Sequence, residues 1–268
     1  MIGDTVKVGP DGFVQLRDFM GTDKTICDAA RVSYDQHGKQ GDNRKLIRYL
    51  MRHRHTSPFE QCEVQFVVRV PMDIWRQWVR HRTASINEYS TRYREAIDSV
   101  AIPQSDEWRL QSTTNKQGSE GQLPELDARR CSHEFASASG ACLRAYERMI
   151  GLGVAREQAR SVLQLATYTE AFWKIDLHNL LHFIALRIDK HAQQEIREYA
   201  QAILDLIAPL FPLTIEAFFD YRVNAMTLSD LDIAAIARQD WTGETIEDAR
   251  ERREYLDKLV VLELGGDK

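Results

Sequence analysis

Apolar and polar residues alternate along the segment 63–70, and this period of two predicts a β-strand with one buried face. Its apolar positions are Val64, Phe66, Val68 and Val70. Pro71 then removes the next hydrogen-bond donor and ends the pattern. Two short apolar runs around the turn at residues 10–12 predict a hairpin near the start of the chain. The aromatic and β-branched stretch 167–175 predicts a further strand.

Apolar residues recur at helical spacing through much of the remaining chain. Asp73 is expected to cap a helix that runs to about Arg82. Several helices with few strands predict an α+β fold, in which helices pack on a small, mainly antiparallel sheet within a single elaborated domain. The other helices are predicted around Leu177–Ile184 and over residues 44–54, 130–150, 154–165 and 191–210.

Two polar segments stand outside this pattern. Residues 103–128 contain glycine and proline, so they are expected to form a loop or a local insertion. Residues 244–262 are rich in charge and predict an amphipathic helix that could dock on its own subunit or on a neighbouring one. The apolar positions at helical spacing in this second segment are Ile246, Ala249, Leu256 and Val260.

The 268 residues are 43% hydrophobic, and 35 basic residues against 40 acidic residues give a net charge of −5. This composition is typical of a water-soluble globular protein with a sizeable core. No run of about 18 apolar residues exists, and the N-terminal sequence lacks the pattern of a signal peptide. We therefore expect a cytoplasmic protein without a membrane span.

The cysteines and tryptophans indicate packing. The four cysteines form no CxxC pair, which fits neither a disulfide framework nor a cysteine-based zinc site. They are expected to be reduced thiols. The cysteines are Cys27, Cys62, Cys131 and Cys142. Trp75, Trp78 and Trp173 are assigned to the core, with Trp78 also considered as a ligand contact.

Basic residues are concentrated between Arg76 and Arg94, where five arginines accompany a single acid, Glu88. The segment 80–93 reads RHRTASINEYSTRY. Guanidinium and imidazole groups at a helix end can bind phosphate oxygens, and the carboxylate and hydroxyls of the following loop can contact the polar edges of a base or sugar. The pattern is consistent with a nucleotide site and also with a solvated basic surface.

The pattern RHR, seven residues and then serine, together with NEYS-x-RY, is similar to the signature of the flavin-dependent thymidylate synthases. Four more segments resemble that family in the same order: HRHTSPFE at 53–60, RQW at 76–78, VAREQAR at 154–160 and DLHNLLHFIALRIDKHAQQEIREYA at 176–200. The resemblance covers residues 5–222. It implies a synthase domain at 1–222, in which 103–128 is a variable loop, and a charged, largely helical C-terminal extension at 223–268.

The resemblance implies the reductive methylation of dUMP to dTMP. The carbon would come from methylenetetrahydrofolate and the hydride from FAD that NADPH has reduced, with release of tetrahydrofolate. It also implies a homotetramer with active sites at subunit junctions. The sequence contains neither GxGxxG nor GxxxxGK[ST], so FAD and NADPH would be held by other side chains.

The same resemblance assigns residues to the two ligands. FAD would be contacted by Ser57 of another subunit and by Arg80, His81, Arg82, Glu88, Asp176, Leu177, His178 and His182. dUMP would be contacted by Gln77, Trp78, Val79, Arg80, Glu88, Tyr89, Ser90, Thr91, Arg92, Arg160 and Arg187.

Arg187 is expected to carry the chemistry. A guanidinium beside N3 and O4 of uracil can stabilise the anionic form of the base, and it stays charged at any working pH. A salt bridge at a helix end is the alternative for this residue. Ser90 is interpreted as a nucleotide-binding hydroxyl, because the sequence offers no paired base beyond the distant His81.

Two other functions compete for these residues. His178 and His182, four apart, with His191 further on, could bind zinc in a metal hydrolase, but HExxH is absent, no suitable carboxylate base is spaced for it, and no metal is predicted. The arginines of residues 76–94 could bind RNA or single-stranded DNA. The net charge of −5 and the shortness of this segment argue against a nucleic-acid partner.

Overall fold

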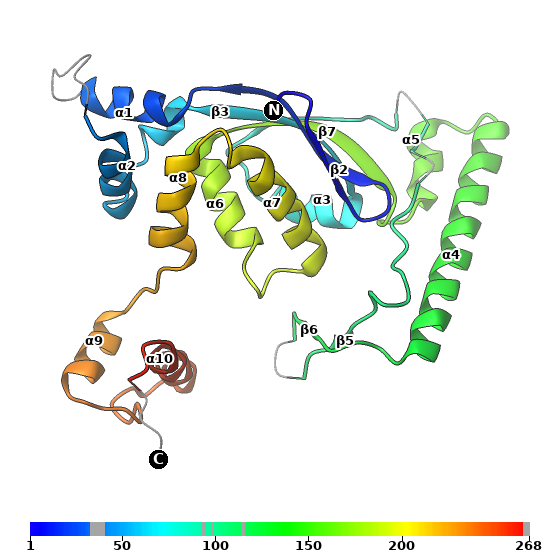
Figure 1. Cartoon of the computed structure of the whole chain (residues 1–268). Helices are drawn as coiled ribbons and strands as arrows, with labels where there is room; N and C mark the ends of the chain where they lie inside the picture. The colour runs from blue at the N-terminus through cyan, green and yellow to red at the C-terminus, as the bar shows by residue number, and fades with distance from the viewer. Residues whose placement is uncertain (33–40, 93–94, 98, 114–115, 265–268) are drawn as a thin grey trace. The chain divides into compact units, whose positions relative to one another are not determined.

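The computed structural model describes residues 1–32, 41–92, 95–97, 99–113 and 116–264 of the chain (Figure 1). Tyr93 and Arg94, which belong to the arginine-rich segment, lie outside these ranges. The chain divides into two compact units, Met1–Ala217 and Phe218–Lys268. No helix in the described ranges is both long and apolar enough to span a membrane.

The first unit is built on a five-stranded sheet with the order β1-β2-β3-β7-β4. Every neighbouring pair in this sheet is antiparallel, which confirms the predicted α+β class with a small antiparallel sheet. The predicted hairpin, the alternating strand and the strand at 167–175 correspond to β1 with β2, to β3 and to β7. The strands are β1 (Thr5–Val8), β2 (Gly12–Met20), β3 (Glu63–Pro71), β7 (Tyr168–Asp176) and β4 (Ser85–Glu88).

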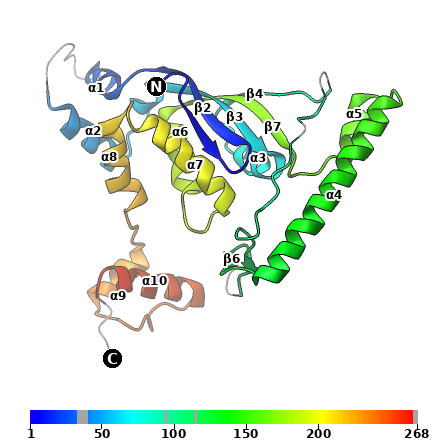
Figure 2. The same cartoon turned by 45° about the vertical axis from the view of Figure 1, so that its right-hand side comes forward.

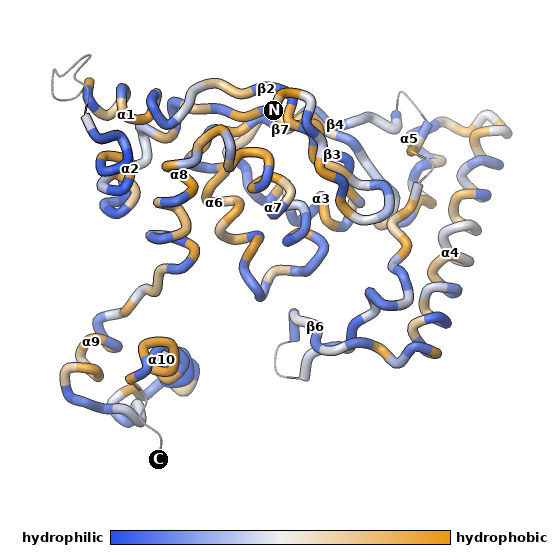
Figure 3. The backbone as a smooth tube through the Cα atoms, in the orientation of Figure 1, coloured by the Kyte–Doolittle hydropathy of each residue, from blue (hydrophilic) through white to orange (hydrophobic). Residues whose placement is uncertain are grey.

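The core lies between this sheet and three helices. The predicted inward positions of β3 are fully buried. The ring of Phe66 lies 5.9 Å from that of Trp173 on β7, and Trp173 lies 5.0 Å from Phe183 of α6. Figures 1 and 2 show the three helices on one side of the sheet, and Figure 3 shows apolar positions concentrated along α6 and α7. The three helices are α3 (Met72–Trp78), α6 (Leu177–Arg187) and α7 (Gln194–Ile207).

The helix after β3 differs from the prediction. Asp73 does not cap it, because the N-cap is Pro71 and makes no side-chain bond. The first amides are satisfied by the main chain: Met72 N donates to Thr167 O at 3.1 Å and Asp73 N to Leu165 O at 3.0 Å. The helix ends at Trp78 and not near Arg82, and the expected loop contains the strand β4, because residues 85–88 pair with the edge of β7.

Other helices also depart from their predicted bounds. The predicted helix 154–165 is wrong: this segment forms only a four-residue helix, α5 (Arg156–Ala159), and a 3₁₀ turn, η2 (Arg160–Val162). Ala159 is the one buried residue of these two elements, so no continuous apolar face supports a longer helix. Two further helices correspond to predicted ones, α2 (Asn43–Arg52) and α4 (Glu125–Gly151). Three were not predicted: α1 (Asp23–Val32), η1 (Phe59–Gln61) and α8 (Pro212–Phe218).

The polar segment 103–128 is less irregular than predicted. It contains a small hairpin of β5 (Leu110–Gln111) and β6 (Ser119–Glu120), and α4 already begins at residue 125. Arg109 connects the segment to the start of α7, where it donates to Gln194 Oε1 at 2.8 Å and forms an ion pair with Glu195 at 2.6 Å.

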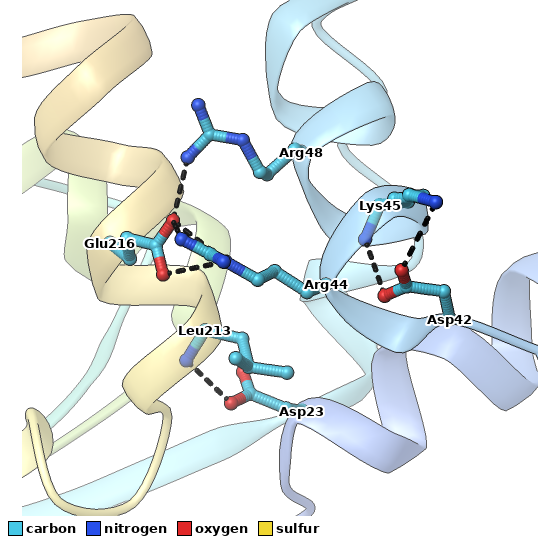
Figure 4. A network of polar contacts seen from close by, with 7 residues as sticks. All are labelled: Asp23, Asp42, Arg44, Lys45, Arg48, Leu213 and Glu216. Atoms are coloured by element: carbon cyan, nitrogen blue, oxygen red, sulfur yellow. Dashed lines mark hydrogen bonds and ion pairs between the residues drawn. The ribbon is translucent and has the colours of Figure 1, made fainter.

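Polar contacts join α8 to the two N-terminal helices (Figure 4). Asp23 of α1 accepts hydrogen bonds from Leu213 N at 2.8 Å and from Thr214 N at 3.1 Å, so it caps the start of α8 from a distant part of the chain. Arg44 and Arg48 of α2 both form ion pairs with Glu216 at 2.7 Å. Burial and these contacts fix α1, α2 and α8 together.

The second unit contains η3 (Phe219–Val223), α9 (Asp230–Ala237) and α10 (Ala249–Val261). The charged helix predicted over 244–262 therefore begins five residues later. Its packing also differs: Ile246 precedes the helix and is buried with Tyr255 and Leu259, whereas Val260 is 72% exposed. Lys258 and the buried Asp232 form an ion pair at 2.6 Å across the two helices.

Candidate active site

Glu88, the last residue of β4, has a defined orientation. Trp75 Nε1 donates a hydrogen bond to Glu88 Oε2 at 3.0 Å, and Thr169 Oγ1 donates to Oε1 at 2.8 Å. The two donors come from α3 and β7, and both residues are buried. Pairing of β4 with β7 places Glu88 opposite Ala171 and next to these donors.

A cavity of about 440 Å³ lies beside this carboxylate. Arg160 of η2 donates to Thr91 Oγ1 at 3.2 Å across it, and Ser90 Oγ accepts from Arg92 N at 3.3 Å. The structure thus brings together five of the residues predicted to contact dUMP. The polar side chains around the cavity include Glu88, Tyr89, Ser90, Thr91 and Arg160.

Several residues of this cavity lie outside the sequence motifs. Thr169 lines it and holds Glu88, and Met72, Leu163, Gln164 and Leu165 form other parts of its wall. Thr169 gave no separate signal, because one threonine in a strand rich in β-branched and aromatic residues is ordinary. Its contact with Glu88 depends on the register of β4 against β7, which places Glu88 opposite Ala171, two residues from Thr169.

A second group of predicted residues gathers where α3 ends and α6 ends. Arg187 Nη2 donates to the main-chain oxygen of Gln77 at 2.8 Å, and Gln77 Nε2 donates to Gln193 Oε1 at 2.6 Å. The rings of His81 and His182 lie 5.6 Å apart. In the described part of the chain, neither Gln77 nor Arg187 lines the cavity beside Glu88.

The electrostatics of this second group keep His81 neutral. Burial, the nearby Arg187 guanidinium and His182 together lower the pKa of His81 to about 4. Burial also lowers the pKa of Arg187, whose Nε atom is buried without a hydrogen-bond partner among the described residues. A guanidinium remains protonated in proteins, so this arginine is a half-buried cation beside a neutral imidazole.

The residues predicted to contact FAD have different environments. Arg80 and Arg82 are exposed after α3, and Ser57 is exposed between α2 and η1. Asp176 is the N-cap of α6 and accepts from Asn179 N at 3.0 Å. His178 is half-buried on the first turn of that helix.

Trp78 and Leu177 are fully buried in the core. Trp78 lies 5.0 Å from the rings of both Trp173 and Phe183, and Leu177 N donates to Cys62 O at 2.8 Å. The assignment of Trp75, Trp78 and Trp173 to packing is confirmed. A ligand could reach Trp78 or Leu177 only after a local rearrangement, so their predicted contacts with dUMP and FAD stay predictions.

The histidines considered for zinc do not gather around one point. Within the described ranges, no group of three or more His, Cys, Asp or Glu residues is placed to hold a metal ion. His182 faces His81, and His191 contacts Asp189 Oδ1 at 2.8 Å.

The sequence matches known proteins over most of its length. Residues 15–213 match the family model described as "Thymidylate synthase complementing protein". A flavin-dependent thymidylate synthase of Gluconobacter oxydans is 42% identical over 259 residues, which cover 94% of this chain and 85% of that protein. The enzyme of the same name from Wolbachia pipientis wMel is 44% identical over 233 residues, 87% of this chain and 82% of that protein.

The fold matches solved structures as well. The UMP/dUMP methylase PolB from Streptomyces cacaoi, bound with 5-Br dUMP, superposes with a TM-score of 0.73 at 33% identity and covers 81% of this chain and 99% of its own. The same protein bound with 5-Br UMP gives a TM-score of 0.74 at 33% identity, with 81% and 98% of the two chains covered. Motifs, fold and relatives agree, and the chain belongs to the family of flavin-dependent thymidylate synthases.

Proposed function

We propose that this chain converts dUMP to dTMP, with methylenetetrahydrofolate as carbon donor and with FAD, reduced by NADPH, as hydride source. One observation supports the proposal most directly: a single cavity is lined by the fixed carboxylate of Glu88, the guanidinium of Arg160 and the hydroxyls of Thr91 and Ser90. A 2′-deoxynucleoside monophosphate has a matching set of groups: a dianionic phosphate, a sugar hydroxyl and an imide. The names of the relatives support the same reaction.

Charge determines which end of dUMP meets which side chains. The phosphate is proposed to bind at Arg160 and at the turn of Ser90, Thr91 and Arg92, where guanidinium groups and hydroxyls can donate to its oxygens. The carboxylate of Glu88 repels a phosphate and accepts from a hydroxyl or an imide N–H instead. Tyr89 is tied by its hydroxyl to Glu95 O at 2.8 Å and is proposed to form part of the wall.

Arg187 is proposed to activate the base. The new bond forms at C5 of uracil, so electron density must rise on that carbon. A permanent cation near N3 and O4 stabilises the anionic form of the ring without itself giving up a proton. The half-buried guanidinium strengthens this effect, since charges interact more strongly away from water.

The donor set fits FAD at the second group. Arg80, His81, Arg82 and His182 present cationic and imidazole groups near one another, and the 5.6 Å contact of His81 with His182 brings the segments 80–82 and 176–182 together. Bound FAD would supply hydride transfer. The proposed task of these side chains is to hold the diphosphate and the ring system of FAD, with Asp176 and His178 at the start of α6 and Ser57 donated by another subunit.

We further propose a homotetramer with shared active sites. The residues predicted for dUMP fall into two groups: Glu88, Thr91 and Arg160 line the cavity, whereas Gln77 and Arg187 meet beside His81. A site that needs both groups can be completed by the second group of another subunit. We assign this activity to residues 1–222 and treat 223–268 as an extension.

Product analysis tests the proposed function. The purified FAD-containing protein is incubated with dUMP, methylenetetrahydrofolate and NADPH, and the nucleotide and folate products are separated. We expect a yellow protein that forms dTMP and tetrahydrofolate. Dihydrofolate as the product would contradict the proposal, because the folate would then have supplied the hydride. UMP in place of dUMP serves as the comparison substrate.

A further inference from the structure

Glu88 is an exposed residue at the end of an exposed edge strand, yet both of its carboxylate oxygens have hydrogen-bond donors. Thr169 is 3% exposed and Trp75 is 4% exposed. Thr169 belongs to β7, where it pairs with Val70 of β3, and β4 pairs with the other edge of the same strand from Ala171 onward. An exposed carboxylate is thus attached to a rigid part of the core.

These bonds restrict Glu88 without saturating it. A carboxylate offers about four lone-pair sites, and the two donors use two of them. Each oxygen keeps one site for a ligand in the cavity. A free glutamate side chain would lose rotamer freedom when a ligand binds, whereas this one has already lost it on folding.

We propose that Thr169 is a positioning residue of the nucleotide site, which acts through its hydrogen bond to Glu88 and orients that carboxylate for dUMP. The inference rests on the proposed function, because it takes dUMP as the occupant of the cavity. Thr169 lines the cavity at its buried side, and its hydroxyl already donates to Glu88 Oε1 at 2.8 Å. Its effect on the nucleotide is therefore carried by Glu88.

Thr169→Val removes the hydroxyl and keeps the branched shape of a strand residue. We expect the Kd and KM for dUMP to rise about fivefold to tenfold, which is the range for a lost hydrogen bond that water partly replaces. The kcat at saturating dUMP should change less than about threefold, because the reacting groups remain in place. Thr169→Ser restores the hydroxyl and should return both constants to within about twofold of the wild type.

A double-mutant cycle separates positioning from general damage to the fold. In a Glu88→Ala background, Thr169→Val should cause no further rise in the Kd for dUMP, because the group through which it acts is absent. Equal losses in both backgrounds would overturn the proposal. Thr167→Val is the matched control: Thr167 is equally buried, precedes β7 and lies outside the cavity lining, and its variant should bind dUMP as the wild type does.

The readouts also distinguish this inference from the function on which it rests. Wild-type protein that neither binds dUMP in calorimetry nor forms dTMP would refute the proposed function. Wild-type protein that does both, with a Thr169→Val variant of unchanged Kd and KM, would refute the positioning role alone. Thermal unfolding of each variant shows whether a loss follows from instability, and Thr169→Ala, which also lacks the hydroxyl, keeps the test valid if the valine variant unfolds.

Discussion

Arg187 Nη2 donates a hydrogen bond to the main-chain oxygen of Gln77 at 2.8 Å. This bond joins the end of α6 to the end of α3, two elements that are far apart in the sequence. It restrains a half-buried guanidinium whose Nε finds no partner in the described part of the chain. One terminal nitrogen therefore fixes the Arg187 guanidinium against the end of α3.

Arg187→Ala should abolish most of the turnover and leave the fold intact. Removal of a single preorganised donor to developing charge costs about 2.7–4 kcal/mol of transition-state stabilisation, or about 100- to 1,000-fold in kcat. Steady-state kinetics with dUMP varied at saturating folate and NADPH measure the effect. Arg187→Lys keeps the charge but not the planar donor geometry, and we expect it to recover only part of the activity.

Arg31→Ala is the control for this variant. Arg31 is also largely buried and bonds Asn43 Oδ1 at 2.9 Å, but it lies on α1, away from both groups of predicted site residues. It should keep wild-type kcat. Wild-type turnover in Arg187→Ala would remove this arginine from the proposed mechanism.

His81 should make the protein less stable in mild acid. Its pKa in the folded state is about 4, against an ordinary value of 6.5, because of burial and the charge of Arg187. Above pH 6.5 the imidazole is neutral in both states and has no effect on stability. As the pH falls from 6.5 to 4 the unfolded state binds the proton first, so this residue lowers the free energy of unfolding progressively through that window.

Thermal unfolding of the wild type and of His81→Gln from pH 8 to pH 4 tests this dependence. The variant should lose less of its melting temperature between pH 6.5 and pH 4, because glutamine does not titrate. NMR gives an independent check: the His81 ring should not titrate above pH 5, and Arg187→Gln should raise its pKa by removing a nearby cation. If the melting temperatures of the two proteins fell equally with pH, the lowered pKa of His81 would be contradicted.

The strands could be predicted because their patterns are local. Val64, Phe66, Val68 and Val70 all face one core, and that alternation is visible without knowledge of the partner strands. β4 could not be predicted in this way, because all four of its residues are exposed and it exists only through pairing with β7. Its sequence resembles a loop until the edge of β7 is known.

The candidate site was predicted from motifs more than from patterns. The motifs identified Glu88, Thr91 and Arg160, which the structure places around one cavity. They did not identify Thr169, since its role depends on strand register, and spacing alone misassigned Asp73 as a cap. The first amides of α3 donate to the main-chain oxygens of Leu165 and Thr167, so this helix needs no side-chain cap. Partners so distant in the sequence leave no signal in the local pattern.

Asp23 should contribute strongly to stability. It is 8% exposed and accepts hydrogen bonds from two amides at the start of α8 and from the Thr214 hydroxyl. Asp23→Ala leaves these donors unsatisfied, and we expect the free energy of unfolding to fall by about 1–3 kcal/mol in urea titrations. Asp23→Asn keeps one acceptor oxygen and should lose less. Equal losses in both variants would show that charge, and not the acceptor geometry, matters.

Cys27 and Cys62 should resist alkylation in the folded protein. Both are fully buried, and burial raises the pKa of each thiol to about 11, so the reactive thiolate is scarce at pH 8. Iodoacetamide followed by peptide mass spectrometry should leave both unmodified in buffer and modify both in urea. Rapid modification of either one in buffer would show that α1 or the start of β3 opens readily.

FAD should stabilise the assembly of subunits. The predicted contacts with FAD are spread over residues 57, 80–88 and 176–182, and no single dinucleotide-binding loop gathers them. If Ser57 comes from another subunit, the assembled state binds FAD more tightly than a lone chain does. A ligand at about 100 times its dissociation constant stabilises the state that binds it by roughly 2.7 kcal/mol, so removal of FAD should favour smaller species on dilution.

Sedimentation velocity with and without FAD, across a dilution series, measures this linkage. We expect the FAD-loaded protein to stay tetrameric at concentrations where the FAD-free protein dissociates. Ser57→Ala should weaken FAD binding and shift the dissociation to higher protein concentration, whereas Ser137→Ala, an exposed serine on α4 outside the predicted site, should change neither. A monomer that keeps full FAD occupancy and forms dTMP would show that one chain builds the whole site. The role proposed for Ser57 across subunits would then be wrong, and the two groups of residues around Glu88 and Arg187 would have to act on the same dUMP within one subunit.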